Sequence, residues 1–300
     1  MKAILPLMMW IVCFPWVLRA GEPTGRYKMI VDQMLVLQKK YSAVSNLIYL
    51  GPNGEGTEII GMRVSITPTV MDPKKVAHII VSTHHGDESA APVFTMVMLE
   101  KLIQRYLSDE LYLTDLAKTE WVVIPVLNIT GYNANQRREY ARDPNRDYPS
   151  PCTNHPGGAL KSISQLIRHL TGRIYSGSLT VHGYQGSLTY PWGLYSNNYQ
   201  TLDHNQFAQI TAKAVSINGY KHGTASDIVY PANGCYEDYA YWKHGLWSLL
   251  LELKSGSAED IRLTTLATFN FFDQLDSSPS VKNQFNGKCT RESAVDLRME

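Results

Sequence analysis

Apolar side chains recur at helical spacing near the start of the chain. Within residues 26–41 they fall on one side of a helix, and polar residues occupy the other side. These apolar residues are Met29, Ile30, Met34, Leu37 and Tyr41. We therefore predict that an amphipathic helix opens the folded part of the protein.

Further along, four apolar runs predict strands that are buried on both faces, because they lack an alternating polar position. They occupy residues 76–82, 121–128, 177–182 and 246–253. Helical patterns lie between and after them, at residues 91–107, 159–172, 205–218 and 263–275. The alternation predicts a single α/β domain, with a mixed, mainly parallel twisted sheet covered by helices on both faces.

Polar residues stand at or just beyond the end of each predicted strand. The sequence His-His-Gly-Asp-Glu follows the first strand, and a polar segment at residues 128–138 follows the second. His182 ends the third strand, and Glu252 lies near the end of the fourth. Because ligands bind beyond the carboxyl ends of parallel strands, we expect these clusters to form one site.

The first twenty residues resemble a secretory signal peptide. Lys2 is followed by sixteen residues without a charge, and Leu-Arg-Ala then precedes Gly21. We divide the chain into a signal peptide at 1–20, a folded domain at 21–276 and a polar tail at 277–300, which we expect to be loosely held. The division predicts a secreted or periplasmic protein without stable membrane insertion after signal removal.

Composition narrows the range of partners. The net charge of the 300 residues is +1, and no Lys/Arg cluster forms a basic face, which argues against nucleic acid as a partner. A small molecule or peptide is expected instead, and the oligomeric state stays open. Asn128-Ile-Thr is a formal glycosylation sequon, but its place at the end of an apolar run predicts that it is unused.

Cysteine usage agrees with an oxidising compartment. Cys13 would leave with the signal peptide, so Cys152, Cys235 and Cys289 remain. Three cysteines allow at most one internal disulfide, and the sequence leaves the pairing open.

A His-x-x-Glu pair and a later histidine suggest a metal site. His85 and Glu88 stand three residues apart at a turn into a helix, which brings an imidazole and a carboxylate to one side. A catalytic zinc ion typically has three His or Glu ligands and one open position, and His182 is a candidate for the third. His84 would then face outward. A polar turn without a metal is the alternative interpretation of the pair taken alone.

A dense group of guanidinium groups predicts a site for a carboxylate ligand, which arginine binds in a bidentate manner. The group comprises Arg137, Arg138, Arg142 and Arg146, with Asn145 among them. A solvated loop paired with local acids is the alternative.

Glu252 is an acid inside a strand that otherwise predicts burial. Burying an ionised carboxylate is costly unless it is paired or used, so we consider Glu252 a candidate general base beside a metal-bound water. A frayed strand end facing solvent is the alternative.

Taken together, these residues resemble the zinc carboxypeptidases of the pancreatic type over most of residues 24–275. His-Gly-Asp-Glu matches the family's His-x-x-Glu motif and implies His85 and Glu88 as zinc ligands. The segment Thr-Val-His-Gly-Tyr, followed by Tyr-Pro-Trp-Gly, resembles the third-ligand segment and implies His182. The resemblance implies one Zn²⁺ per chain and a catalytic domain at 21–276.

Two further segments of the resemblance imply the substrate site. Arg-Asp-Pro-Asn-Arg-Asp-Tyr-Pro implies that Asn145 and Arg146 hold the terminal carboxylate of a peptide, and that Asp143 orients His85. Tyr230 corresponds to the family's mobile tyrosine, and Glu252, 22 residues later, to its catalytic glutamate.

The implied reaction is attack of water, activated by Zn²⁺ and Glu252, on the last peptide carbonyl, so that one residue is released from the C-terminus of a peptide or protein. An arginine would stabilise the oxyanion, and we prefer Arg138 over Arg137 for this role. Arg137 and Tyr184 are further candidates for substrate binding.

Seven residues after Tyr230, Glu237 falls at the position that forms the base of the family's side-chain pocket. An acid there implies a preference for C-terminal Lys or Arg. Asp238 matches an acid common to the family, so a shift of one residue would remove Glu237 from the pocket. The chain is expected to lack the long inhibitory pro-segment of the digestive enzymes. It also has Tyr239 where Trp is usual, and fewer residues separate Glu88 from His182.

Fold alone does not determine the substrate. A cell-wall peptide carboxypeptidase or an amide-cleaving acylase would use the same zinc and glutamate, and an inactive peptide-binding paralogue would keep only the cleft. The presence of all three candidate ligands and of Glu252 argues against the inactive form.

Overall fold

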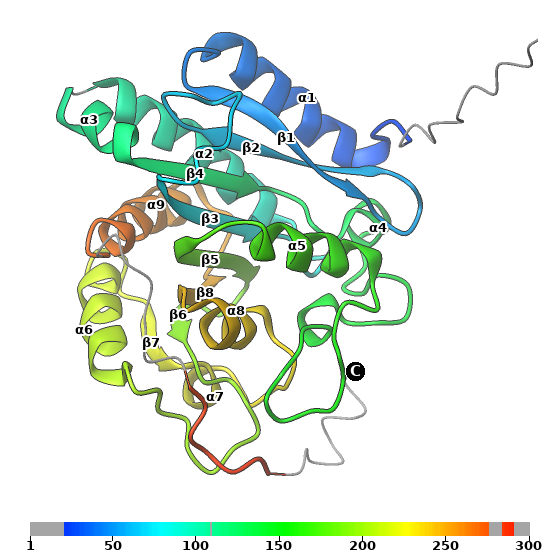
Figure 1. Cartoon of the computed structure of the whole chain (residues 1–300), viewed down its shortest axis with the longest axis vertical. Helices are drawn as coiled ribbons and strands as arrows, with labels where there is room; N and C mark the ends of the chain where they lie inside the picture. Colours follow the sequence, from blue (N-terminus) through cyan, green and yellow to red (C-terminus); the bar gives the residue numbers. More distant parts are fainter. Residues whose placement is uncertain (1–20, 109, 276–283, 291–300) are drawn as a thin grey trace, which may run out of the picture.

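A sheet of eight strands forms the centre of the protein (Figure 1). The structure, a computed structural model, describes residues 21–108, 110–275 and 284–290. The predicted signal peptide and most of the predicted tail lie outside the described residues.

The strand order is β1-β2-β4-β3-β5-β8-β6-β7. Strands β4, β3, β5 and β8 run parallel to one another, whereas β1–β2, β2–β4 and β6–β8 are antiparallel pairs. The mixed, mainly parallel α/β sheet predicted from the sequence is confirmed. The strands are β1 (Ser45–Pro52), β2 (Glu58–Val64), β3 (Val76–Ser82), β4 (Thr119–Ile124), β5 (Tyr175–Gly183), β6 (Ser187–Tyr190), β7 (Lys221–Thr224) and β8 (Trp247–Leu253).

Helices cover both faces of the sheet. Helices α2 and α9 pack against β3, β5 and β8 on one face, with α6 beside α9, while α5 and α8 lie on the other (Figure 1). None of the helices in the described ranges has both the length and the apolar character that crossing a bilayer requires. The helices are α1 (Gly25–Lys40), α2 (Ala90–Ser108), α3 (Glu110–Lys118), α4 (Ile129–Ala134), η1 (Pro144–Arg146), α5 (Lys161–Thr171), α6 (His204–Val215), α7 (Ala225–Ile228), α8 (Tyr236–His244) and α9 (Ala258–Phe272).

Central strands are buried on both sides, as their unbroken apolar runs predict. In β3, for example, Ile79, Ile80 and Val81 are all fully buried. The predicted second strand ends at Ile124 rather than at residue 128, because Asn128 instead accepts a hydrogen bond from the amide of Gly131 and begins α4. The side chain of Asn128 is fully buried.

The sequence analysis missed several elements. The hairpin of β1 and β2 extends the sheet at one edge, and helices α3 and α8 were not predicted. Helix α8 matters for function because it carries Glu237 and Asp238 on its first turn.

The predicted tail is held more firmly than we expected where it is described. Cys289 forms a disulfide with Cys152, which leaves Cys235 unpaired among the cysteines of the described residues. Residues 284–290 also pair with the loop after β6, through hydrogen bonds such as that from the amide of Thr290 to the carbonyl of Tyr195, at 2.8 Å. The expectation of a loosely held tail is therefore wrong for residues 284–290.

A buried ionic cluster stabilises the end of the sheet at which β3 and β4 begin. The carboxylate of Glu120, with its side chain 0% exposed, accepts hydrogen bonds from the guanidinium groups of Arg63 and Arg173. The Arg173 side chain is only 4% exposed. Removing one member of such a group leaves a buried charge uncompensated, so this cluster is sensitive to substitution.

We expect Glu120→Gln to lower the free energy of unfolding by about 3 kcal/mol, because two guanidinium groups lose their anionic partner. Urea titration followed by tryptophan fluorescence measures this change. Glu259→Gln is the matched control, since it removes one member of the exposed Glu259–Arg262 pair, and it should leave the unfolding midpoint unchanged. Equal midpoints for Glu120→Gln and the unchanged protein would contradict the prediction.

Candidate active site

Three side chains from two segments, the turn after β3 and the end of β5, meet at the carboxyl ends of these strands. The Nδ1 atom of His85 lies 2.7 Å from Oε1 of Glu88 and 3.1 Å from Nδ1 of His182. The second oxygen of Glu88 lies 3.0 Å from the same nitrogen of His182. These three buried residues form a group whose donor atoms could hold one metal ion.

The local backbone explains how adjacent histidines take different roles. Thr83, with a positive φ of 62°, turns the chain at the end of β3. His85 then faces His182, whereas Nε2 of His84 lies 2.8 Å from the hydroxyl of Tyr148. We expected His84 to face outward, and this is wrong, because its ring is fully buried among other aromatic rings.

The donor atoms fit a zinc ion. Two neighbouring donor atoms of a tetrahedral zinc site, with metal–ligand bonds of about 2.0 Å, lie roughly 3.3 Å apart, and the separations here are close to that value.

The site also attracts positive charge. Burial alone would lower the pKa of His182, but the carboxylate of Glu88 raises it to about 9. Burial would likewise raise the pKa of Glu88, but His182 and His85 lower it to about 2.

Asp143 contacts His85 at the ring nitrogen that faces away from Glu88. One carboxylate oxygen of Asp143 lies 3.0 Å from Nε2 of His85 and accepts a hydrogen bond from the amide of Asn145. The other oxygen accepts two hydrogen bonds from Arg137, at 2.9 and 3.1 Å. Histidine ligands of metals usually have such a carboxylate on their second nitrogen. The predicted contact between Asp143 and His85 is therefore present.

Glu252 faces the same cluster from β8. It pairs in register with His182 across the β5–β8 ladder. Burial, opposed by His182 and reinforced by the nearby carboxylate of Glu88, raises the pKa of Glu252 to about 7. A carboxyl group that titrates near neutral pH is suited to accepting and returning a proton.

The structure changes our preference between the two arginines. A guanidinium nitrogen of Arg137 lies 3.8 Å from Oε1 of Glu88, next to the candidate metal ligands. The guanidinium of Arg138 instead donates to the carbonyl of Ala141, three residues further along its own loop. Of the two arginines, Arg137 is therefore the one that these contacts bring beside the candidate metal ligands, and the arginine that stabilises an oxyanion stays a prediction.

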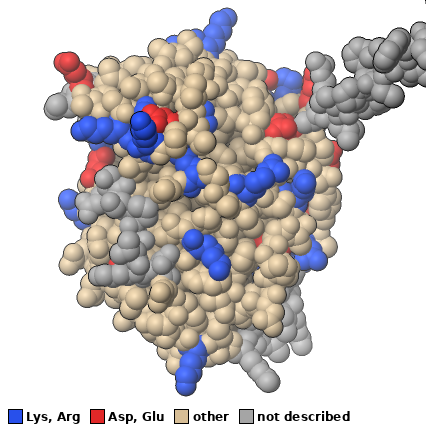
Figure 2. Space-filling model, viewed as in Figure 1, with Lys and Arg blue, Asp and Glu red and all other residues tan. Residues whose placement is uncertain are grey.

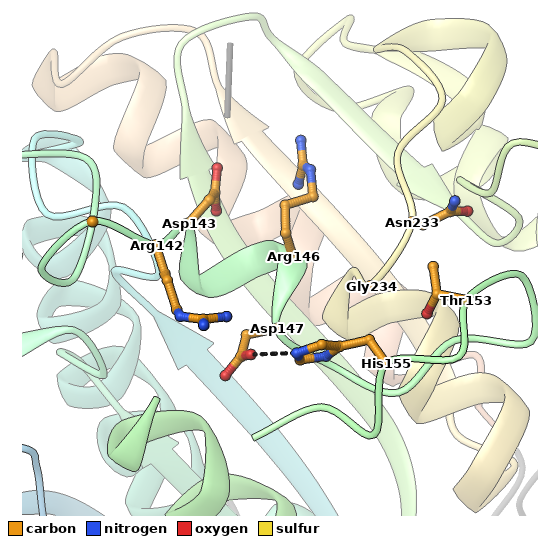
Figure 3. Close-up of a pocket in the computed structure, with 9 residues that line it drawn as sticks. Arg142, Asp143, Arg146, Asp147, Thr153, His155, Asn233 and Gly234 are labelled. Carbon is orange, nitrogen blue, oxygen red and sulfur yellow. Dashed lines mark ion pairs between the residues drawn. The ribbon is translucent and has the colours of Figure 1, made fainter. Parts of the chain in front are cut away.

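The predicted carboxylate-binding groups lie together at η1. Arg146 donates to the hydroxyl of Tyr230 at 3.1 Å, and Asn145 is fixed by accepting the amide of Tyr236 at 2.9 Å. In Figure 3 the side chains of Asp143 and Arg146 extend to the same side of η1, away from Asp147 and His155. Tyr230 is 45% exposed, so its ring is free to contact a ligand at the mouth.

A pocket opens between these groups and the first turn of α8. Glu237, which is 2% exposed, lies at its wall and accepts a hydrogen bond from the hydroxyl of Thr180. Both carboxylate oxygens of the neighbouring Asp238 accept a hydrogen bond from the amide of Gly193, at 2.9 and 3.1 Å. The pocket is lined by both acids together with His182, Arg146, Cys235 and Glu252.

Several residues at this pocket were not predicted, among them Thr180, Leu250 and Cys235. Thr180 precedes His182 by two residues, and Leu250 precedes Glu252 by two, so each pair lies on one face of its strand. That period-two spacing could have predicted both. Cys235 has no comparable local pattern, because it enters the pocket through the turn before α8.

Tyr184 lies at the rim rather than in the pocket. Its hydroxyl accepts the amide of Ala90 at the start of α2, at 3.1 Å, and its side chain is 51% exposed. On the face shown in Figure 2, Lys and Arg side chains are scattered among uncharged atoms rather than gathered in one basic patch.

A mixed α/β sheet with a His-Glu-His site at its strand ends, and with the half-buried Glu252 beside that site, defines a metallopeptidase of the carboxypeptidase class. The comparison with family models agrees, because the model for zinc carboxypeptidases matches residues 30–272. The chain therefore belongs to the zinc carboxypeptidase family, whose members depend on zinc.

Similar proteins are distant in sequence. Carboxypeptidase O of Bos taurus is 24% identical, and the match covers 76% of this chain and 70% of that protein. Carboxypeptidase B of Homo sapiens is 26% identical over 57% of this chain and 49% of that protein, so the chain spans about half the length of this relative. The crystal structure of carboxypeptidase A from Helicoverpa armigera has a TM-score of 0.68 at 17% identity, covering 82% of this chain and 71% of that chain. This structural likeness confirms the fold.

We expect the purified protein to bind one zinc ion per chain, and His182→Gln to lose most of the bound metal because one of three ligands is removed. Metal content by mass spectrometry after dialysis measures the ratio. His155→Gln is the control, since this partly exposed histidine lies apart from the three candidate ligands. Equal zinc content in the two variants would contradict the assignment.

Proposed function

We propose that this protein is a secreted zinc carboxypeptidase that removes one residue at a time from the C-termini of peptides. The observation that carries the proposal is the placement of Arg146 and Tyr230 in one pocket with His182 and Glu252. A site for a free carboxylate therefore adjoins the candidate site of hydrolysis.

Each residue has a role that its position supports. His85, Glu88 and His182 hold the metal. Bound zinc would supply a Lewis acid that activates water and polarises the peptide carbonyl. Glu252 removes a proton from the attacking water and passes it to the leaving amine.

The remaining charged groups position the substrate. Arg137 stabilises the negative charge that develops on the carbonyl oxygen, since it is the guanidinium group beside Glu88. Asn145 and Arg146 bind the terminal carboxylate, and Tyr230 closes over it from the mouth of the pocket. Tyr184, at the rim, contacts the residues that precede the scissile bond.

Secretion is supported by two independent features. The N-terminal residues 1–20 have the pattern of a signal peptide. The disulfide between Cys152 and Cys289 is a bond that persists in oxidising compartments such as the periplasm or the extracellular space.

Glu237 supports a preference for a C-terminal Lys or Arg. Its carboxylate is buried in the pocket wall and accepts a hydrogen bond from Thr180. A cationic terminal side chain would supply the counter-charge that a buried carboxylate requires.

The function is tested with a mixture of peptides that have free or amidated C-termini and that end in Arg, Lys, Phe, Leu or Glu. We expect loss of one residue from the free-ended peptides only, and no reaction with a chelator present, because both the carboxylate site and the metal are required. Mass spectrometry of the products measures this. Trimming restricted to branched or D-residue peptides would favour a cell-wall role, and no trimming by the zinc-loaded protein would exclude carboxypeptidase activity.

Glu252→Gln provides the control for that experiment. It should keep bound zinc and lower kcat by at least about a thousandfold, because the general base is lost. In the unchanged enzyme, kcat/KM should fall as the pH drops below neutrality, since Glu252, whose pKa burial raises to about 7 in the metal-free site, takes up a proton. Bound zinc would move this transition to lower pH by favouring the carboxylate.

Glu237→Gln should lower kcat/KM for peptides that end in Lys or Arg by about a hundredfold, because the buried counter-charge is removed. Peptides that end in Leu should be cleaved at an unchanged or higher rate. The ratio of kcat/KM for Arg-ended and Leu-ended peptides measures the effect. An unchanged ratio would show that Glu237 does not select the terminal side chain.

A further inference from the structure

Part of the pocket wall is built by the loop that follows β6, through Gly193. Gly193 in this loop donates its amide to Asp238, and its carbonyl accepts the amide of Ala232 at 2.6 Å. Gly193 and Ala232 both line the pocket with Glu237. The position of this loop therefore fixes the width of the space that receives a terminal side chain.

The outer side of the same loop is covered by residues 284–290. The amide of Asn197 donates to the carbonyl of Lys288 at 3.0 Å, and the amide of Lys288 donates to the side chain of Asn197 at 2.7 Å. A further hydrogen bond joins the side chains of Asn198 and Asn286 at 3.0 Å. The C-terminal segment thus forms a second layer behind the pocket wall.

An aromatic contact extends this layer inward. The ring of Phe285 meets the ring of Trp192 at 5.5 Å and nearly at right angles, an arrangement that stabilises aromatic pairs. Trp192 is fully buried and directly precedes Gly193. A shift of residues 284–290 would therefore displace Trp192, the residue next to Gly193 in the pocket wall.

The disulfide fastens this segment to the other side of the site. Cys152 belongs to the loop that follows η1, and its neighbour Thr153 faces Asn233 across the polar pocket of Figure 3. Asn233 in turn accepts the amide of Tyr195 at 3.2 Å. The bond between Cys152 and Cys289 joins the loop after Arg146 to residues 284–290, which in turn bond to the loop after β6.

We propose that residues 284–290 and the Cys152–Cys289 disulfide act as a clasp that holds the 191–199 loop in place and thereby sets the fit of the terminal side chain. The clasp contacts neither the metal ligands nor Glu252 through any of these bonds. Its role is to position the wall of the pocket, so it acts on substrate binding rather than on chemistry. The inference rests on the proposed function, because it assumes that this pocket receives the terminal residue.

The test is the double variant Cys152→Ser/Cys289→Ser, prepared with zinc. For a peptide that ends in the bulky residue the unchanged enzyme prefers, we expect KM to rise about fivefold with kcat unchanged, because the loop must be ordered on binding. For a peptide that ends in Ala, both constants should stay the same. Amide hydrogen exchange in the 191–199 loop should become faster, and this second measurement does not depend on activity.

Phe285→Ala tests the same contact with the disulfide intact, in case the double variant fails to fold. Lys288→Ala is its matched control, because Lys288 contributes its backbone amide and carbonyl to the contact. We expect Phe285→Ala, but not Lys288→Ala, to raise KM for the bulky residue and to speed exchange in the loop.

The outcomes separate the two proposals. An unchanged protein that trims no peptide would overturn the proposed function, while faster exchange in the loop would still support the clasp. Trimming with the same KM and the same exchange in every variant would overturn the clasp and leave the proposed function standing. An equal fall in kcat for all peptides would also contradict the clasp, since it indicates a general loss of folded enzyme.

Discussion

The carboxylate of Asp143 is the contact on which the arrangement of the site depends. It meets His85, Arg137 and the amide of Asn145 at distances of 2.9 to 3.1 Å. Burial alone would raise the pKa of Asp143, but His85, Arg146 and Arg137 hold it well below its usual range. A permanent anion at this point therefore orients a metal ligand, an arginine and the turn η1 with a single group.

The sheet supplies the second constraint, because it brings ionisable side chains, whose removal from water costs free energy, to one edge. His182 and Glu252 lie in register on β5 and β8, and His85 follows β3, the other neighbour of β5. Three adjacent parallel strands thus deliver three ionisable side chains to the same end. Each would be unfavourable if buried alone, so their mutual pairing and a bound cation offset the cost that the fold imposes.

The parts of this structure that could be predicted from the sequence are those with local patterns. Unbroken apolar runs gave the central strands, and the turn after β3 gave His85 and Glu88 their shared face. The hairpin of β1 and β2 was missed, because its strands include polar or exposed positions instead of an unbroken apolar run and lie toward the sheet edge. The disulfide joins residues 137 positions apart, and no local pattern encodes such a pairing.

Side-chain direction in irregular loops was the other limit. Arg137 and Arg138 are adjacent in sequence, and the contacts of Arg137 with Asp143 and Glu88 distinguish the one that faces the site. His84 and His85 differ in the same way, because the backbone turn at Thr83 decides which ring brings a nitrogen next to Nδ1 of His182. In regular strands a fixed period removes this ambiguity, as the pairs Thr180–His182 and Leu250–Glu252 illustrate.

The two adjacent acids on α8 show how the pocket can carry a defined charge. Burial raises the pKa of Asp238 to about 8, although the amide of Gly193 opposes the shift and Glu237 adds to it. At neutral pH Asp238 is therefore mainly protonated, and it holds the pocket wall by its bonds to Gly193. Glu237 accepts a hydrogen bond from Thr180 in the same pocket, so the attachment of the wall and the proposed contact with a cationic side chain fall to neighbouring residues. The raised pKa of Asp238 also means that alkaline pH adds a buried negative charge at the point where the wall is attached.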